Sequence, residues 1–278
     1  MSATDVRPGD LDAARLVSAV VVALMAASSA AGLLVPGLYR DPPEVVAALR
    51  AYDTVSLVLA TPLLIGSLVA ARRGSALARP VWLGLLMYAC YNYAIYAFGS
   101  AFNGLFLLHA ALLPLPVVGA VLLMRDIDAA GVRDRFRQGT PVRVISAVLV
   151  LAGVGLAGTW VFQSVRFALT GTPPDETELV LLMQAVHLAY VLDLTFFAPL
   201  CVLASVLLWR RDPRGFVLAT AVLVFGSLYQ VNYVVALVFQ LRAGIPGARG
   251  FDPAEPFVIA AFVVALLAMV LPGRRRSP

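Results

Sequence analysis

The sequence predicts an all-α fold: a polytopic transmembrane helical bundle of eight spans, arranged as two parallel four-helix repeats with both termini cytoplasmic. Three observations predict this class. The 278 residues are 61% hydrophobic and 13% charged, with a mean hydropathy of +0.89. Apolar stretches of about 20 residues, the length that a helix needs to cross a bilayer, recur between short charged loops. The arginines gather in alternate loops, as the positive-inside rule requires.

The predicted spans leave no loop long enough for a separate soluble domain. We expect them at Leu16–Leu38, Ala47–Ala71, Pro80–Phe98, Phe102–Met124, Val144–Phe167, Leu179–Trp209, Gly215–Leu241 and Pro256–Leu271. The corresponding domains are a first four-helix repeat at 1–127, a cytoplasmic linker at 128–142 and a second four-helix repeat at 143–278.

The arginines set the predicted orientation. Most lie before the first span, after the second, fourth and sixth spans, or after the last. The exceptions are Arg40, Arg50, Arg166, Arg242 and Arg249. This asymmetry puts both termini in the cytoplasm and the protein in the plasma membrane. The net charge of +5 therefore marks one membrane face, so the expected partner is the lipid bilayer and no nucleic acid.

An internal repeat is predicted from matched segments. Residues 15–20, Arg-Leu-Val-Ser-Ala-Val, resemble residues 143–148, Arg-Val-Ile-Ser-Ala-Val, and each segment opens a repeat. Four more pairs follow in the same order: Pro42-Pro43 with Pro173-Pro174, Pro62 with Pro199, Arg72-Arg73 with Arg210-Arg211, and Asn92-Tyr93 with Asn232-Tyr233. Because each half holds an even number of spans, both halves start in the cytoplasm, which predicts parallel repeats.

Pro62 and Pro199 are predicted to bend their spans. At 1.5 Å per residue, Pro62 lies about 15 Å from Arg72, and Pro199 lies about 16 Å from Arg210, which places both near the membrane midplane. A proline removes one helix hydrogen bond, and bends at matching sites of two repeats are typical of a cavity between them. Prolines that only shape helix packing are the alternative.

The ionisable groups inside the spans are Asp53, His109, His187 and Asp193, and such groups are costly in lipid. Counted from the cytoplasmic arginines, Asp53, Asp193 and His109 lie about 28, 25 and 24 Å along their helices, in the outer third of the membrane. His187 falls at the outer interface. The sequence therefore predicts a polar pocket that opens to the outside. An interfacial ion pair with Arg50 is the alternative for Asp53.

Uncharged polar residues complete the predicted site. Tyr91 and Asn92 share a face of the third span, and Asn232 lies in the seventh. The predicted ligand-binding residues are Asp193, His109, Asn92, Tyr91, Asn232, His187 and Asp53. On an ideal helix His187 and Asp193 point about 120° apart, so they can share a wide cavity but not a hydrogen bond. Asn side chains that only bridge helices are the alternative.

No cofactor or metal is predicted. A metal site needs three or four convergent ligands, and the chain has only two histidines. Cys90 and Cys201 lie inside spans, where a small apolar role is expected. No serine or cysteine sits in a nucleophile turn, so no residue is predicted to be catalytic. A lipid-directed hydrolase with His109 or His187 as base remains an alternative.

Several segments are similar to a group of bacterial and archaeal polytopic membrane proteins of uncharacterised activity. They are Leu38-Tyr39-Arg40-Asp41, residues 71–75, the run YNYAIYAFGSAFNGLFLLHAALL at residues 91–113, and Val191-Leu192-Asp193-Leu194 followed by Pro199 and Arg-Arg-x-Pro-x-Gly. The resemblance implies the membrane architecture. It implies no activity, ligand or catalytic residue.

The leading functional hypothesis is binding or transport of a small or amphiphilic molecule through the outward-facing pocket. One alternative is a membrane enzyme that acts on lipid head groups. Another is a sensor or a subunit that assists assembly of a membrane complex. Eight helices leave room for a homo-oligomer to complete a pathway.

Overall fold

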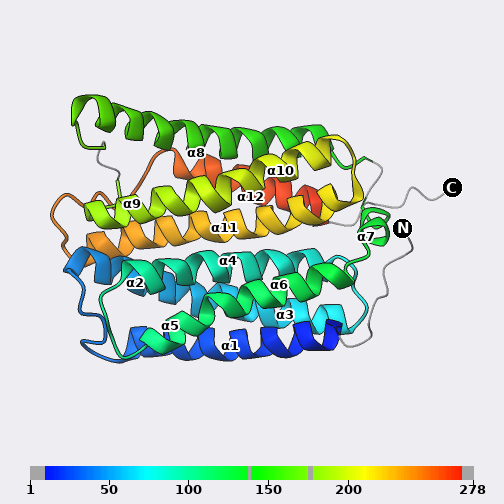
Figure 1. Cartoon of the computed structure of the whole chain (residues 1–278), viewed down its shortest axis with the longest axis horizontal. Coiled ribbons are helices and arrows are strands. Elements are labelled where there is room, and N and C mark those ends of the chain that lie inside the picture. Colours follow the sequence, from blue (N-terminus) through cyan, green and yellow to red (C-terminus); the bar gives the residue numbers. More distant parts are fainter. Residues whose placement is uncertain (1–9, 137–138, 175–177, 271–278) are drawn as a thin grey trace.

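The computed structural model describes residues 10–136, 139–174 and 178–270, and every regular element in these ranges is a helix. The long helices run side by side along one direction (Figure 1). Seven of the described helices are long and apolar enough to cross a membrane. An eighth apolar helix, at the predicted position of the last span, has 16 residues and is shorter.

The first half of the chain forms one side of the bundle and the second half forms the other (Figure 1). The first half contains α1 (Asp10–Leu34), α2 (Pro43–Val55), η1 (Ser56–Ala60), α3 (Thr61–Arg72), α4 (Ala78–Gly99), α5 (Phe106–Leu112), α6 (Pro114–Asp126) and the short α7 (Ala129–Arg133). The second half contains α8 (Val142–Thr170), α9 (Met183–Leu192), η2 (Asp193–Phe197), α10 (Ala198–Trp209), α11 (Pro213–Arg242) and α12 (Glu255–Val270).

Some helix ends differ from the predicted ones for identifiable reasons. Helix α1 ends at Leu34 rather than Leu38 because Pro36 and Gly37, which has φ +68°, form a turn. The sixth span begins at Met183 rather than Leu179, since the preceding Leu182 is extended. The predicted end of the last span at Leu271 and the residues Arg7, Arg137, Arg274, Arg275 and Arg276 lie outside the described residues.

Two spans contain a π-helical segment directly before a proline. The amide of Thr61 donates to the carbonyl of Ser56, and the amide of Ala198 donates to the carbonyl of Asp193, each across five residues. Pro62 and Pro199 follow these amides and have no amide hydrogen of their own. Both prolines therefore follow a π-bulge, a feature that often accompanies functional sites.

Helices α4 and α11 form the centre of the bundle and pack against each other, one from each half (Figure 1). In α4, 72% of the most apolar window is buried, whereas in α8 only 22% is buried, so α8 lies at the periphery. Gly84 permits the close approach of the two central helices. A Cβ atom at this position would lie 2.4 Å from the carbonyl oxygen of Ala221 on α11.

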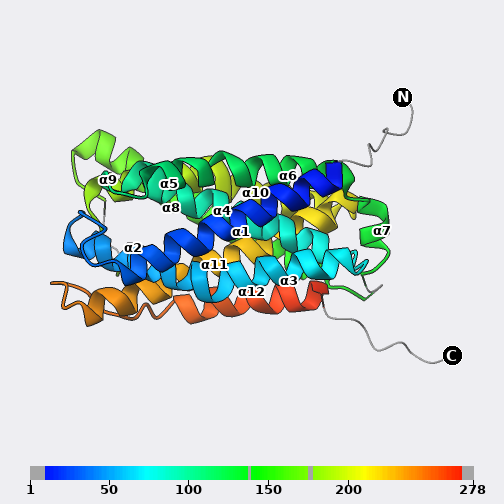
Figure 2. The same cartoon turned by 90° about the horizontal axis from the view of Figure 1, so that it is seen from below.

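The two ends of the described chain lie at the same end of the bundle. Helix α1 begins and α12 ends at the same end of the bundle, beside α7 (Figures 1 and 2). We name it the arginine-rich end because α3, α6 and α10 also finish there with Arg72, Arg125 and Arg210.

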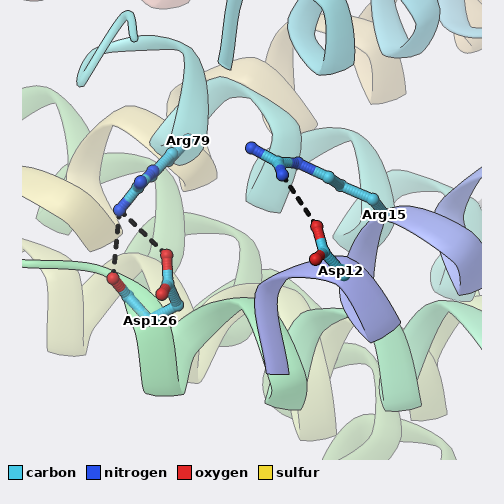
Figure 3. Close-up of polar contacts among 4 residues, drawn as sticks. All are labelled: Asp12, Arg15, Arg79 and Asp126. Carbon is cyan, nitrogen blue, oxygen red and sulfur yellow. Dashed lines mark hydrogen bonds and ion pairs between the residues drawn. The ribbon is translucent and has the colours of Figure 1, made fainter. Parts of the chain in front are cut away.

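Ion pairs occur at the arginine-rich end (Figure 3). Arg79 at the start of α4 donates to the backbone oxygen of Asp126 at 3.0 Å and lies 3.0 Å from its carboxylate, which ties α4 to α6. Arg15 pairs with Asp12 within α1 at 2.9 Å. Such pairs contribute about 1 kcal/mol or less where they are exposed, so they fix geometry more than they add stability.

The contact at Gly84 gives a test of the central packing. We expect Gly84→Ala to lower the free energy of unfolding by about 1 to 3 kcal/mol, because the added methyl group overpacks the α4–α11 contact. Gly158→Ala on α8 is the matched control, since a Cβ there meets no atom within 4 Å. Thermal unfolding of both variants in detergent measures the difference. Equal melting temperatures for the two would contradict the close contact.

Candidate functional site

A cavity of about 110 Å³ is lined by residues of α2, α4, α8, α9, η2 and α11 and of the segment before α9. Helix α9 lies at the end of the bundle opposite the arginine-rich end (Figure 1). We name this space the Asp193 cavity. Its walls carry one carboxylate, six aromatic rings and several aliphatic side chains. The lining residues are Tyr52, Tyr91, Ile95, Trp160, Leu179, Leu181, Val186, Ala189, Tyr190, Asp193, Tyr229, Asn232 and Tyr233.

Asp193 is fully buried and accepts three hydrogen bonds, each from a different helix. The hydroxyl of Tyr91 on α4 donates at 2.7 Å, the indole N–H of Trp160 on α8 at 2.9 Å, and the hydroxyl of Tyr229 on α11 at 3.2 Å. All three donors are neutral. Among the described residues, no arginine or histidine lies within ion-pair distance of this carboxylate.

The aromatic walls are held by ring contacts. Trp160 stacks on Tyr190 with ring centres 4.1 Å apart, and Tyr91 meets Tyr229 edge to face at 5.3 Å. Phe197 supports Tyr229 from behind in a stacked contact at 5.2 Å. Such pairs add about 0.5 to 1.5 kcal/mol beyond their buried area. The ring positions are therefore fixed by packing before any ligand arrives.

A cyclic hydrogen-bond network joins the two halves of the chain beside the cavity. Its members are Ser56, Tyr88, Asn92 and Asn232, which we name the polar ring. Ser56 lies 3.1 Å from Tyr88, Tyr88 donates to Asn232, Asn232 to Asn92, and Asn92 to Ser56, at 3.1 to 3.2 Å. With Ser56 donating to Tyr88, each group donates once and accepts once. All four polar side chains are thus satisfied at membrane depth.

Asp53 lies in a second, closed cluster within the first half. Its carboxylate accepts hydrogen bonds from Tyr39 at 2.6 Å and from Tyr96 at 3.0 Å. Burial, with the neighbouring Asp53 charge, raises the pKa of Tyr39 in the loop after α1, so its hydroxyl remains a donor. Gly32 makes room, since a Cβ there would overlap the Asp53 and Tyr39 oxygens.

The structure brings only part of the predicted site together. Asp193, Tyr91 and Asn232 line the cavity, and Asn92 lies behind Asn232 in the polar ring. These four residues lie on α4, η2 and α11, in both halves of the chain.

The two histidines and Asp53 lie away from the cavity walls. His109 is buried beside the Asp53 cluster, 3.0 Å from Ser28, with its ring centre 4.9 Å from that of Tyr96. His187 is exposed on α9. In the described part of the chain, no group of three or more His, Cys, Asp or Glu side chains could hold a metal ion.

Gln240 positions one wall of the cavity. Its buried side-chain amide accepts from the backbone N–H of Val180 at 2.9 Å and donates to the carbonyl of the same residue at 2.7 Å. It also donates to the carbonyl of Glu44 at the start of α2, at 3.0 Å. This clamp fixes the backbone between Leu179 and Leu181, which both line the cavity. The same segment displaces the start of the sixth span.

A wider depression of about 410 Å³ lies at the arginine-rich end. Asp12, Arg15, Leu16, Ala19 and Arg72 line it. It is an open surface groove beside the exposed Leu16, and the lining contains none of the predicted site residues. The Asp193 cavity is therefore the better candidate for a specific site.

Sequence reasoning missed Trp160 and gave Tyr229 no role, although each donates to Asp193. A signal was present for Tyr229, which lies one helical turn before Asn232. Trp160 carries no local signal, because α8 is apolar around its whole circumference and its sequence does not reveal the inward face.

The fold and the cavity together define a multi-pass helical membrane protein with a small aromatic site around a buried carboxylate. No family model, curated protein or solved structure matches the chain. Its function is therefore argued from the geometry alone.

The polar ring gives a matched test on one helix. We expect Tyr88→Phe to lower the free energy of unfolding by about 1 to 2 kcal/mol, because it deletes two buried hydrogen bonds and leaves the Asn232 side-chain carbonyl without its donor. Tyr93→Phe is the control, since the equally buried Tyr93 hydroxyl has no partner among the described residues. Unfolding in detergent, followed by circular dichroism, compares them. A Tyr93→Phe loss as large as that of Tyr88→Phe would refute the ring.

Proposed function

We propose that this protein binds a small molecule in the Asp193 cavity, as a transporter or transport-related binding protein of the plasma membrane. One observation carries the proposal: a fully buried carboxylate, with no cationic side chain in ion-pair distance among the described residues, borders an unfilled cavity. An ionisable group at membrane depth is costly and is retained where it serves a ligand or an ion. A bound molecule would supply the contacts that the cavity walls leave unmade.

The orientation follows from the loops. Arginines concentrate at the arginine-rich end, where α1 begins and α12 ends. The positive-inside rule assigns that end to the cytoplasm. We infer that the Asp193 cavity, near the opposite end, is reached from outside the cell. Helix α12 would then be the eighth span, which returns the chain to the cytoplasm.

We also infer that the two halves are parallel repeats. The π-bulges support this, because Pro62 and Pro199 each lie six residues after the first residue of their segment. Gly84 and Ala221 each lie 22 residues after these prolines, and they meet at the α4–α11 contact. Equivalent residues that meet each other are typical of a two-fold arrangement.

Contacts between helices support the same inference. Helix α2 packs on α11 of the other half, and α9 packs on α4, which is the reciprocal contact. Within each half, α3 packs on α4 and α10 packs on α11. In this alignment Asp193 corresponds to Ser56 rather than to Asp53, so the two aspartates are not equivalent.

Native mass spectrometry tests for a bound molecule. We expect the full chain, purified in mild detergent, to carry a molecule that is released only on denaturation. Asp193→Asn should lose it, because the carboxylate borders the cavity, whereas Asp53→Asn should keep it, since Asp53 lies in the closed cluster. Loss from both variants alike would indicate a general folding defect, and an unoccupied wild type would count against a tightly held ligand.

Cysteine labelling tests access and orientation in intact cells. In a background with Cys90→Ala and Cys201→Ala, Ala189→Cys in the cavity wall should react with a membrane-impermeant maleimide from outside. Ser75→Cys, exposed at the arginine-rich end, should react only after permeabilisation. Reaction of Ser75→Cys in intact cells would reverse the orientation. A failure of Ala189→Cys to react in either state would mean that the cavity is closed.

A further inference from the structure

We propose that the Asp193 cavity binds the methylated ammonium group of a small organic cation, with Asp193 as counter-charge and the aromatic rings as its walls. This inference rests on the proposed function and names the chemical class of its ligand. The carrying observation is the combination of one buried carboxylate with six aromatic side chains around a single small space.

The charge of the site selects a cation. The three groups that donate to Asp193 are neutral, so they orient the carboxylate without cancelling its charge. Acidic groups continue outward from the cavity: Tyr233 in the wall donates to Asp252 at 3.1 Å, and the nearby Glu255 accepts from Gln230 at 2.8 Å. An anionic ligand would be repelled, and a neutral one would leave the buried charge uncompensated.

Four of the six aromatic side chains in the wall already donate their hydrogen to a carboxylate of the protein. The hydroxyls of Tyr91 and Tyr229 and the indole N–H of Trp160 are already committed to Asp193, and the Tyr233 hydroxyl is committed to Asp252. These four side chains therefore offer a ligand π-surface and phenol oxygens, both of which attract a cation. Trp, the strongest cation–π partner, lies stacked on Tyr190 at the wall.

A dimethylated or trimethylated ammonium fits this wall better than a primary amine does. A primary ammonium carries three donors that each need an acceptor. Asp193 has about four acceptor positions, of which its three donors occupy all but one. The Asn232 carbonyl in the same wall already accepts from Tyr88. A dimethylated or trimethylated ammonium donates no more than one hydrogen bond and presents methyl groups to the rings.

The cavity volume of about 110 Å³ suits one small group rather than a whole amphiphile. A free cation such as choline could supply that group, and so could the head group of phosphatidylcholine whose tails remain in the bilayer. The two sources share the same chemistry. The experiment therefore includes an arm for each.

Equilibrium binding to the purified full chain in detergent tests the charge. The probes are choline, tetramethylammonium and 3,3-dimethylbutan-1-ol, in which carbon replaces the choline nitrogen. We expect saturable choline binding, displaced by tetramethylammonium, and an affinity for the neutral isostere that is lower by roughly tenfold or more. Equal binding of the isostere would overturn the cation assignment. This comparison uses the wild-type chain and does not depend on the folding of a variant.

Variants test the residues. Asp193→Asn and Trp160→Leu should each weaken choline binding by roughly tenfold or more, and Trp160→Phe should retain part of it. The matched controls are Asp53→Asn, a buried carboxylate outside the cavity, and Trp209→Leu, an exposed tryptophan at the arginine-rich end. Both controls should bind choline as the wild type does. Equal losses in controls and cavity variants would overturn the assignment.

Nanodiscs of two lipid compositions distinguish a free cation from a lipid head group as the source of the ammonium group. Choline binding that phosphatidylcholine nanodiscs abolish and phosphatidylglycerol nanodiscs leave intact would identify the head group, whereas binding in both would identify the free cation. Either result supports the ammonium site.

If native mass spectrometry finds a bound molecule but no probe binds, the ammonium proposal fails and the proposed function stands. If Ala189→Cys is also never labelled and no molecule is found, both fail.

Discussion

The contact between α4 and α11 is the constraint on which the rest of the structure depends. Inside a bilayer, lipid tails are as apolar as the side chains, so the hydrophobic effect does not hold two helices together. Close packing and hydrogen bonds must do so instead. Gly84 supplies the close approach, and the polar ring, through Asn92 and Asn232, supplies hydrogen bonds across the same contact. Tyr91 and Tyr229, which neighbour these asparagines on α4 and α11, are thereby brought together on Asp193.

The π-bulges determine which residues face this contact. A π-bulge adds one residue to a helical turn. The side chains before the bulge are therefore rotated about the helix axis by about 100° relative to those after it. Ser56 enters the polar ring from the start of one bulge, and Asp193 enters the cavity from the start of the other. The first residue of the π-bulge is thus the neutral Ser56 in the first half and the charged Asp193 in the second half. Under the proposed duplication, a single change of residue type at this position separates the two halves in function.

The limits of sequence reasoning follow from the same geometry. Composition and arginine placement were sufficient to predict a helical membrane protein, because hydropathy is a property of each segment alone. Asp193 could be singled out for its cost in lipid, and Tyr91 for its depth. The angle of about 120° predicted between the His187 and Asp193 side chains is the value for an ideal helix. Which face of α8 turns inward, and hence the role of Trp160, depends on packing with α10 and α12, which no periodicity in α8 records.

The difference between the Asp53 cluster and the Asp193 cavity lies in the loops that precede their helices. In the first half, Tyr39 from a short loop reaches Asp53, and Gly32 makes room for it, so the space around this carboxylate is filled. In the second half, Gln240 on α11 binds the backbone of Val180. The neighbouring Leu179 and Leu181 contribute aliphatic walls to the cavity. Of two equally buried carboxylates with similar donors, only Asp193 thus borders a cavity, whereas the loop side chain of Tyr39 packs against Asp53.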